Sequence, residues 1–171
     1  WCAEPRRQIG VQLQTTPFFR GLTAAENLRL FASFYGVRLR RQQVAAILER
    51  CGLASQARTE AAKLSRGQQK RLAIALILAH EPRLLFLDEP TAALDPRARR
   101  EIRELIRALA ATGAAVVFTS HDMEEVGKLA HRVILIVAGC VRAEGAPSAL
   151  LAQFGATSLE DVYLRLTAEE D

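Results

Sequence analysis

The stretch Leu84-Leu-Phe-Leu-Asp-Glu-Pro90 decides the fold of this 171-residue chain. Four consecutive apolar residues lie between Pro82 and an acidic pair, a pattern typical of a short strand that is buried on both faces. Pro90 cannot donate a backbone hydrogen bond, so it ends the strand directly after Asp88 and Glu89. We therefore predict a buried parallel strand that presents two carboxylates at its carboxyl end.

Two further apolar runs end in polar residues that suit the same site. The run Ile9–Leu13 is followed by Gln14, and the run Ala115–Thr119 is followed by Ser120 and His121. Ligands of open parallel sheets bind beyond the carboxyl ends of the strands, so these side chains are expected along one edge with the acidic pair. A polar turn or local packing would explain each residue alone, whereas their shared position favours a catalytic site.

Helix signals alternate with the apolar runs from residue 82 onward, which predicts an α/β fold with a doubly wound parallel sheet. Helix starts are indicated at Thr23, Ser65, Asp95 and Asp122 by capping residues. We divide the chain into a first strand and loop (1–21), an inserted α-helical subdomain (22–80), a catalytic α/β core (81–145) and two C-terminal helices (146–171). The run Val133–Val137 is expected to be a strand that pairs with residues 141–143.

Composition excludes several classes of protein. Half of the residues are apolar and a quarter are charged, as in soluble globular proteins. The longest apolar run, Leu72–Ala79, is too short to cross a bilayer. Three cysteines (Cys2, Cys51 and Cys140) lack metal-ligand spacing and are interpreted as reduced, buried thiols. The net charge is +4, and the basic residues are scattered along the chain apart from the cluster Arg38–Arg41. No nucleic-acid partner is therefore expected.

The acidic pair is suited to phosphoryl transfer. Asp88 would order a Mg²⁺ ion through water, because Mg²⁺ prefers oxygen ligands and retains several waters. Glu89 would polarise a water molecule for in-line attack on a phosphoryl group. His121 would donate a hydrogen bond to the negative charge that develops on the terminal phosphate.

The stretch Leu64-Ser-Arg-Gly-Gln68 has two interpretations. A capping box between Ser65 and Gln68 explains it as an ordinary helix start. The free N–H groups of a helix N-terminus also bind anions, Gly67 would let a ligand approach the backbone, and Ser65 adds a hydroxyl. From the residues alone, both interpretations stay open.

Taken together, these motifs resemble those of ATP-binding cassette (ABC) proteins, whose fold is similar to that of P-loop ATPases. Leu64–Gln68, Leu84–Pro90, Thr91–Asp95 and Thr119–Asp122 occur in the family's order and spacing, with Gln14 upstream. The resemblance covers essentially the whole chain and implies an ABC nucleotide-binding domain.

The resemblance implies a role for each matching residue. Gln14 is similar to the Q-loop glutamine that senses Mg²⁺, and Ser65, Gly67 and Gln68 to the signature that contacts ATP on the opposite subunit. Asp88 resembles the Walker B aspartate, Glu89 the catalytic glutamate, Asp95 the D-loop aspartate and His121 the switch histidine. Arg66 departs from the family, which more commonly has a second glycine there.

A P-loop, G-x-x-x-x-G-K-[ST], is missing from the 171 residues. The three lysines are Lys63, Lys70 and Lys128, and none follows the required glycines. The family carries this loop upstream of the Q-loop, so we expect it to precede Trp1 and the chain to be N-terminally truncated. We accordingly expect the 171 residues alone to be inactive and to bind ATP weakly.

The resemblance implies an ATPase that uses ATP and Mg²⁺ to power a bacterial exporter, as a chain separate from its permease. Its partners would be a transmembrane permease subunit, docked near 15–21, and a second nucleotide-binding domain in a homodimer or pair. It would lie in the cytoplasm, on the inner face of the cell membrane. The alternatives are a soluble ABC ATPase that acts on nucleic acid or ribosomes, and a truncated, non-catalytic module.

Overall fold

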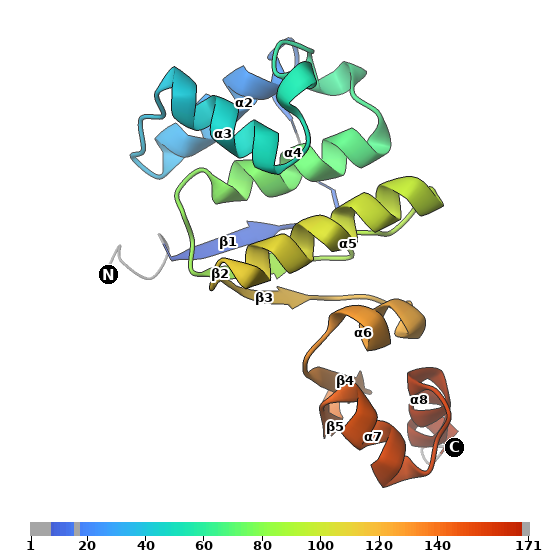
Figure 1. Ribbon diagram of the computed structural model, residues 1–171. Coiled ribbons are helices and arrows are strands. Elements are labelled where there is room, and N and C mark those ends of the chain that lie inside the picture. The colour runs from blue at the N-terminus through green and yellow to red at the C-terminus, as the bar shows by residue number, and fades with distance from the viewer. Residues whose placement is uncertain (1–7, 16–17, 169–171) are drawn as a thin grey trace. The chain divides into compact units, whose positions relative to one another are not determined.

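The computed structural model describes residues 8–15 and 18–168 of the chain (Figure 1). They form two compact units, which divide between Thr119 and Ser120. Each unit has its own sheet, with three strands in the first unit and two in the second.

The first unit alternates strands and helices, as the sequence predicts. Its elements are β1 (Ile9–Gln12), α2 (Ala24–Phe34), α3 (Arg41–Arg50), the 3-10 helices η1 (Ala54–Gln56) and η2 (Ala61–Lys63), α4 (Arg66–Leu78), β2 (Leu84–Leu87), α5 (Pro96–Ala111) and β3 (Ala115–Phe118). The strand order is β1-β2-β3 and both pairings are parallel. Ile9, Leu84 and Ala115 lie opposite one another, so the three strands end together at one edge.

Helices pack on one face of this sheet. Helix α4 contacts β1 and helix α5 contacts β3 (Figure 1), and they bury Leu85 and Leu87 almost completely. On the opposite face Val11, Phe86 and Val117 lie side by side and are exposed by 51, 39 and 47%. The prediction of strands buried on both faces is therefore wrong, because within the described part of the first unit the helices cover a single face.

Helix α4 joins the helical subdomain to the sheet. It packs against α2 and α3 as well as against β1 and α5, and its residues from Leu72 to Leu78 are all buried. A helix that is apolar on all sides in this way is a core element rather than a surface helix. It begins at Arg66, directly after the predicted cap Ser65.

The second unit contains α6 (Met123–Leu129), β4 (Val133–Val137), β5 (Cys140–Gly145), α7 (Pro147–Phe154) and α8 (Leu159–Ala168). Strands β4 and β5 form the predicted antiparallel hairpin. Its turn places Ala138 and Gly139 at φ angles of 49° and 76°, the left-handed region that two-residue hairpin turns use. The hairpin buries alternate residues of β4, among them Leu135, and α7 packs against β5.

The cysteines and the helix lengths test two further expectations. Cys51 is a buried free thiol, and burial raises its pKa to about 12. Cys140 is also a free thiol, but it is exposed, so the prediction that it is buried is wrong. It is exposed because it is the first residue of β5, directly after the hairpin turn. Cys2 lies outside the described residues. Within the described ranges, every helix is too short or too polar to cross a membrane.

His80 connects three elements of the first unit. Its ring stacks on Tyr35, with 3.8 Å between centroids and 4° between planes. Nε2 donates to the carbonyl oxygen of Ile9 at 3.1 Å, so His80 ties the residues after α2 and α4 to the start of β1. Burial lowers the pKa of the imidazole, and the bond to Ile9 opposes this shift more weakly.

We predict that the first unit loses stability as the pH falls from 7.5 to 5.5. The folded-state pKa of His80 lies below its unfolded value, so the unfolded state takes up the proton first and unfolding becomes more favourable with acidification. Urea unfolding at both pH values should show the loss in the wild type and a smaller loss in His80→Gln. His131→Gln, which removes an exposed histidine, should keep the full loss, and an unchanged pH dependence in His80→Gln would contradict the assignment.

Candidate functional site

The carboxyl edge of the three-stranded sheet gathers polar side chains from each strand. Gln14 follows β1 and Glu89 follows β2, and Gln14 Nε2 donates to Glu89 Oε2 at 3.5 Å. The parallel register causes this approach, because it ends both strands at the same level. Two residues that are 75 positions apart in the chain thus share one site.

Thr119 links the two acidic residues to β3. Its hydroxyl donates to Asp88 Oδ1 at 2.7 Å and accepts from the Glu89 N–H at 3.0 Å. The Asp88 N–H continues the strand ladder by donating to the Gln12 carbonyl oxygen at 2.8 Å. From the sequence, Thr119 was predicted only as the end of a strand. A hydroxyl residue at the carboxyl end of the strand beside an acidic pair is the signal that would have found it.

Glu89 has a left-handed backbone, with φ at 42°. For a residue with a side chain, the left-handed conformation is on the order of 1 kcal/mol higher in free energy than a right-handed one. Such conformations are frequent at functional sites. The peptide groups of Glu89 are fixed on both sides. Its N–H is held by Thr119, and its carbonyl oxygen accepts from Ala92 N–H and from Lys70 Nζ, each at 3.2 Å.

Lys70 reaches this edge from α4. Its Nζ also donates to the carbonyl oxygen of Gln14 at 2.9 Å. Burial lowers the pKa of the ammonium group, whereas the carboxylates of Asp88 and Glu89 raise it. The sequence predicted no role for Lys70, which lacks the glycines of a P-loop before it. Its place on a buried helix was the available signal, because a lysine there needs partners.

The start of α4 has the capping box of an ordinary helix start. Ser65 Oγ accepts from Gln68 N–H at 3.3 Å, and Gln68 Oε1 accepts from Ser65 N–H at 2.9 Å. Gly67 is buried, and a Cβ atom built on it would lie 2.7 Å from Ala98 Cβ of α5. The structure therefore gives a packing reason for this glycine: α4 and α5 cross too closely for a side chain. Ser65 and Arg66 are exposed.

Asp95 caps α5 immediately beside that crossing. Its Oδ1 accepts from the N–H groups of Ala98 and Arg97, at 3.0 Å each. These bonds hold the pKa of the exposed carboxyl below its usual range, with the bond from Ala98 as the largest cause. Asp95 and Gly67 thus both lie next to Ala98, at the starts of two adjoining helices.

His121 belongs to the second unit, where it is exposed and precedes the α6 cap Asp122. Its placement beside the acidic pair stays a prediction.

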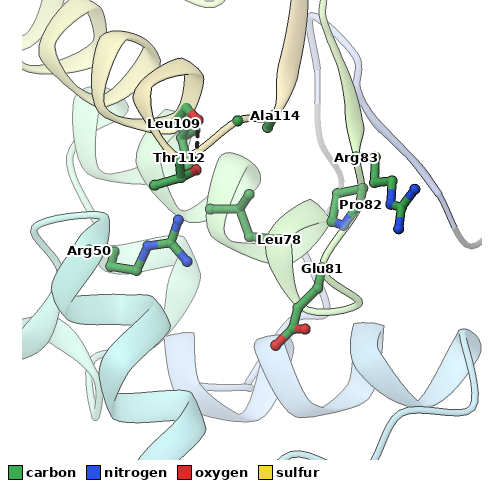
Figure 2. A pocket seen from close by; sticks show the side chains of 9 residues that line it. Arg50, Leu78, Glu81, Pro82, Arg83, Leu109, Thr112 and Ala114 are labelled. Carbon is green, nitrogen blue, oxygen red and sulfur yellow. Dashed lines mark hydrogen bonds between the residues drawn. The ribbon is translucent and has the colours of Figure 1, made fainter.

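A hollow of about 500 Å³ lies at the opposite end of the strands (Figure 2). It is bounded by the residues before β2 and β3, including Arg83 and Ala114, and by the C-terminal ends of α4 and α5. Figure 2 shows Arg50 extending from α3 toward Leu78 and Thr112. The predicted site residues lie elsewhere, so this hollow is separate from the site.

The chain matches one family model and several known proteins. The family model described as "AAA domain, putative AbiEii toxin, Type IV TA system" matches residues 21–127, more than half of the chain. The "Nod factor export ATP-binding protein I" of Paraburkholderia xenovorans (strain LB400) is 39% identical over 161 residues, which cover 88% of this chain and 53% of that protein. A "Fluoroquinolones export ATP-binding protein" of Mycobacterium tuberculosis (strain CDC 1551 / Oshkosh) is 40% identical over 151 residues, with 88% and 49% covered.

The chain is also similar to solved structures of ATP-binding cassettes. An ATP-binding subunit of an ABC transporter superposes with a TM-score of 0.81 at 27% identity, covering 96% of this chain and 70% of that chain. The chain belongs to the ATP-binding domains of ABC transporters. A dimeric ATP-binding cassette bound to ADP and Pi in a post-hydrolysis state has a TM-score of 0.72 at 31% identity, with 83% and 64% covered. This ABC domain spans about half the length of the curated relatives it matches.

The close helix crossing in this ABC domain leads to a stability prediction. Gly67→Ala should lower the free energy of unfolding by about 1–3 kcal/mol, because the new methyl group overlaps Ala98. Combining it with Ala98→Gly should restore much of the loss, and urea unfolding of the four chains measures both effects. If Gly67→Ala stabilises the chain, as helix propensity alone would favour, the packing role is contradicted.

Proposed function

We propose that this chain is the ATP-binding and ATP-hydrolysing part of an ABC exporter, in which two such domains close head to tail on two ATP molecules. The approach of Gln14 Nε2 to Glu89 Oε2, 3.5 Å apart at the carboxyl edge of the sheet, carries the proposal. Phosphoryl transfer needs groups that orient water and stabilise charge at this edge. The relatives named as export proteins favour a membrane partner over nucleic acid.

Glu89 is the proposed catalytic base. Its carboxylate would orient the attacking water and accept its proton as the terminal phosphoryl group is transferred. The backbone bonds from Thr119 and Lys70 support this role, since they hold the peptide from which the carboxylate projects. Gln14 would fix the position of the carboxylate through the hydrogen bond that its side-chain amide donates to Glu89 Oε2.

Asp88 and Gln14 are the proposed residues for Mg²⁺. The donor set fits a hard cation, because it offers a carboxylate oxygen of Asp88 and the amide oxygen of Gln14. Thr119 donates to Asp88 Oδ1 and so fixes the orientation of that carboxylate. A dedicated all-protein cage is not needed, since Mg²⁺ usually takes one or two carboxylates with phosphates and water. When bound, Mg²⁺ would offset the negative charge of the phosphates.

The N-termini of α4 and α5 are proposed to complete the ATP site of the opposite domain. Ser65 is exposed and has a hydroxyl that can turn toward a phosphate, while Gly67 and Gln68 shape the first turn. Asp95 would contact the partner domain beside them. The solved neighbour that is a dimer with ADP and Pi supports pairing of two such domains. His121 would contact the terminal phosphate of the ATP held by its own domain.

ATP binding would also need a P-loop, since these 171 residues contain no G-x-x-x-x-G-K-[ST]. The family carries this loop ahead of the Q-loop. Residues 1–171 joined behind a family segment that carries the loop are called the P-loop form.

A permease is the proposed membrane partner, with the chain held on the inner face of the cell membrane. Three aromatic rings support a docking surface: Phe19, Phe31 and Phe34 lie 5.8–6.1 Å apart between centroids. Phe19 and Phe34 are 43 and 63% exposed, and exposed apolar clusters favour binding of a partner helix. The cluster includes Phe19 of the proposed docking segment 15–21; Thr16 and Pro17 of that segment lie outside the described residues.

Glu89→Gln tests the proposed function. In the P-loop form, loss of the base should reduce ATP hydrolysis at least about 100-fold while ATP remains bound. The closed dimer should then accumulate, and phosphate release with size-exclusion chromatography measures both effects. Glu49→Gln, an equivalent change at an exposed position on α3, should hydrolyse ATP normally. Full hydrolysis by Glu89→Gln would remove Glu89 from the mechanism.

A further inference from the structure

Lys70 contacts the site through backbone oxygens of two separate loops. Its Nζ lies 2.9 Å from the Gln14 carbonyl oxygen and 3.2 Å from the Glu89 carbonyl oxygen. Gln14 lies two residues beyond the end of β1, where the strand ladder no longer fixes the backbone. Glu89 lies two residues beyond the end of β2. A single ammonium group therefore bridges the two strand ends.

This contact differs from a surface ion pair. Lys63, on the same subdomain, pairs with the Glu60 carboxylate while its side chain is 74% exposed, and such pairs contribute little to stability. Lys70 is partly buried and donates to carbonyl oxygens. Charged donors in hydrogen bonds of this kind hold their acceptors more strongly than neutral donors do.

The bridge acts on the conformation of Glu89. The Thr119 hydroxyl holds the N–H of Glu89, and Lys70 holds its carbonyl oxygen, so the left-handed backbone is fixed from both sides. Lys70 is also in the second turn of α4, the helix that begins at Arg66 after its cap Ser65. A displacement of the start of α4 would therefore move a group that is bonded to both Gln14 and Glu89.

We infer that Lys70 is a positioning residue, which fixes the Gln14 and Glu89 backbones relative to each other and couples both to helix α4. Its consequence for catalysis rests on the proposed ATPase function, whereas its effect on the two loops does not.

Amide hydrogen exchange of the 171-residue chain tests the effect on the loops. Asp88, Glu89 and Ala92 report on it, because each of their N–H groups is hydrogen-bonded in the structure. In Lys70→Met these amides should exchange about ten-fold faster, since a charge-assisted bond is lost. Exchange in α3 should be unchanged. Lys70→Arg, which keeps a charged donor, should restore protection, and Lys63→Met should resemble the wild type.

The P-loop form provides a second measurement. Lys70→Met should lower kcat about ten-fold, with KM for ATP changed less than two-fold, because the residue positions the base rather than the nucleotide. Lys70→Arg should recover most of the lost kcat. If the wild type hydrolyses no ATP, the proposed function fails, and faster exchange localised at residues 88–92 still supports the positioning role.

Wild-type exchange at Asp88, Glu89 and Ala92 in Lys70→Met would overturn the inference, whatever the ATPase rate. Uniformly faster exchange that includes α3 in both Lys70→Met and Lys70→Arg would also overturn it, because the residue would then stabilise the whole unit. Should Lys70→Met fail to fold, Lys70→Gln replaces it in the same comparison.

Discussion

The parallel hydrogen-bonded register of β1, β2 and β3 is the constraint on which the site depends. Ile9, Leu84 and Ala115 lie opposite one another, so the three strands end at the same level of the sheet. Gln14, the acidic pair and Thr119 are thereby brought within hydrogen-bonding distance of one another. A shift of one residue in β2 would turn its buried residues Leu85 and Leu87 toward solvent. Their burial therefore also fixes the site.

Helix α4 connects the sheet to the helical subdomain. Its buried apolar residues hold it against β1 and α5, and Lys70 extends from it to the strand ends. At its start, Gly67 allows close contact with Ala98, beside the cap Asp95. Residues that resemble the family's ATP-contacting positions therefore also set the packing of two helices. A substitution at Gly67 should be judged for stability before it is judged for catalysis.

Much of the fold followed from local patterns. The apolar run 84–87 between proline and acidic residues predicted β2, and the capping residues Thr23, Ser65 and Asp95 gave the helix starts. Exposure of Phe86 could not be predicted, because burial of the second face depends on which elements cover it. Lys70 and Thr119 were missed for a related reason: a single polar residue carries no periodic signal, and its partners lie far away in sequence. The approach of Gln14 to Glu89 was predictable, since parallel strands share one carboxyl edge.

The most direct test of the account replaces Mg²⁺ by paramagnetic Mn²⁺ in the ATP-bound P-loop form and follows the backbone amides by NMR. If the metal and the phosphates bind at the carboxyl edge of the sheet, signals of Gln14, Asp88 and Glu89 should broaden most. Those of Arg83 and Ala114, at the opposite end of the strands, should stay sharp. Strong broadening elsewhere, with Gln14 and Glu89 unaffected, would contradict the assignment of the site.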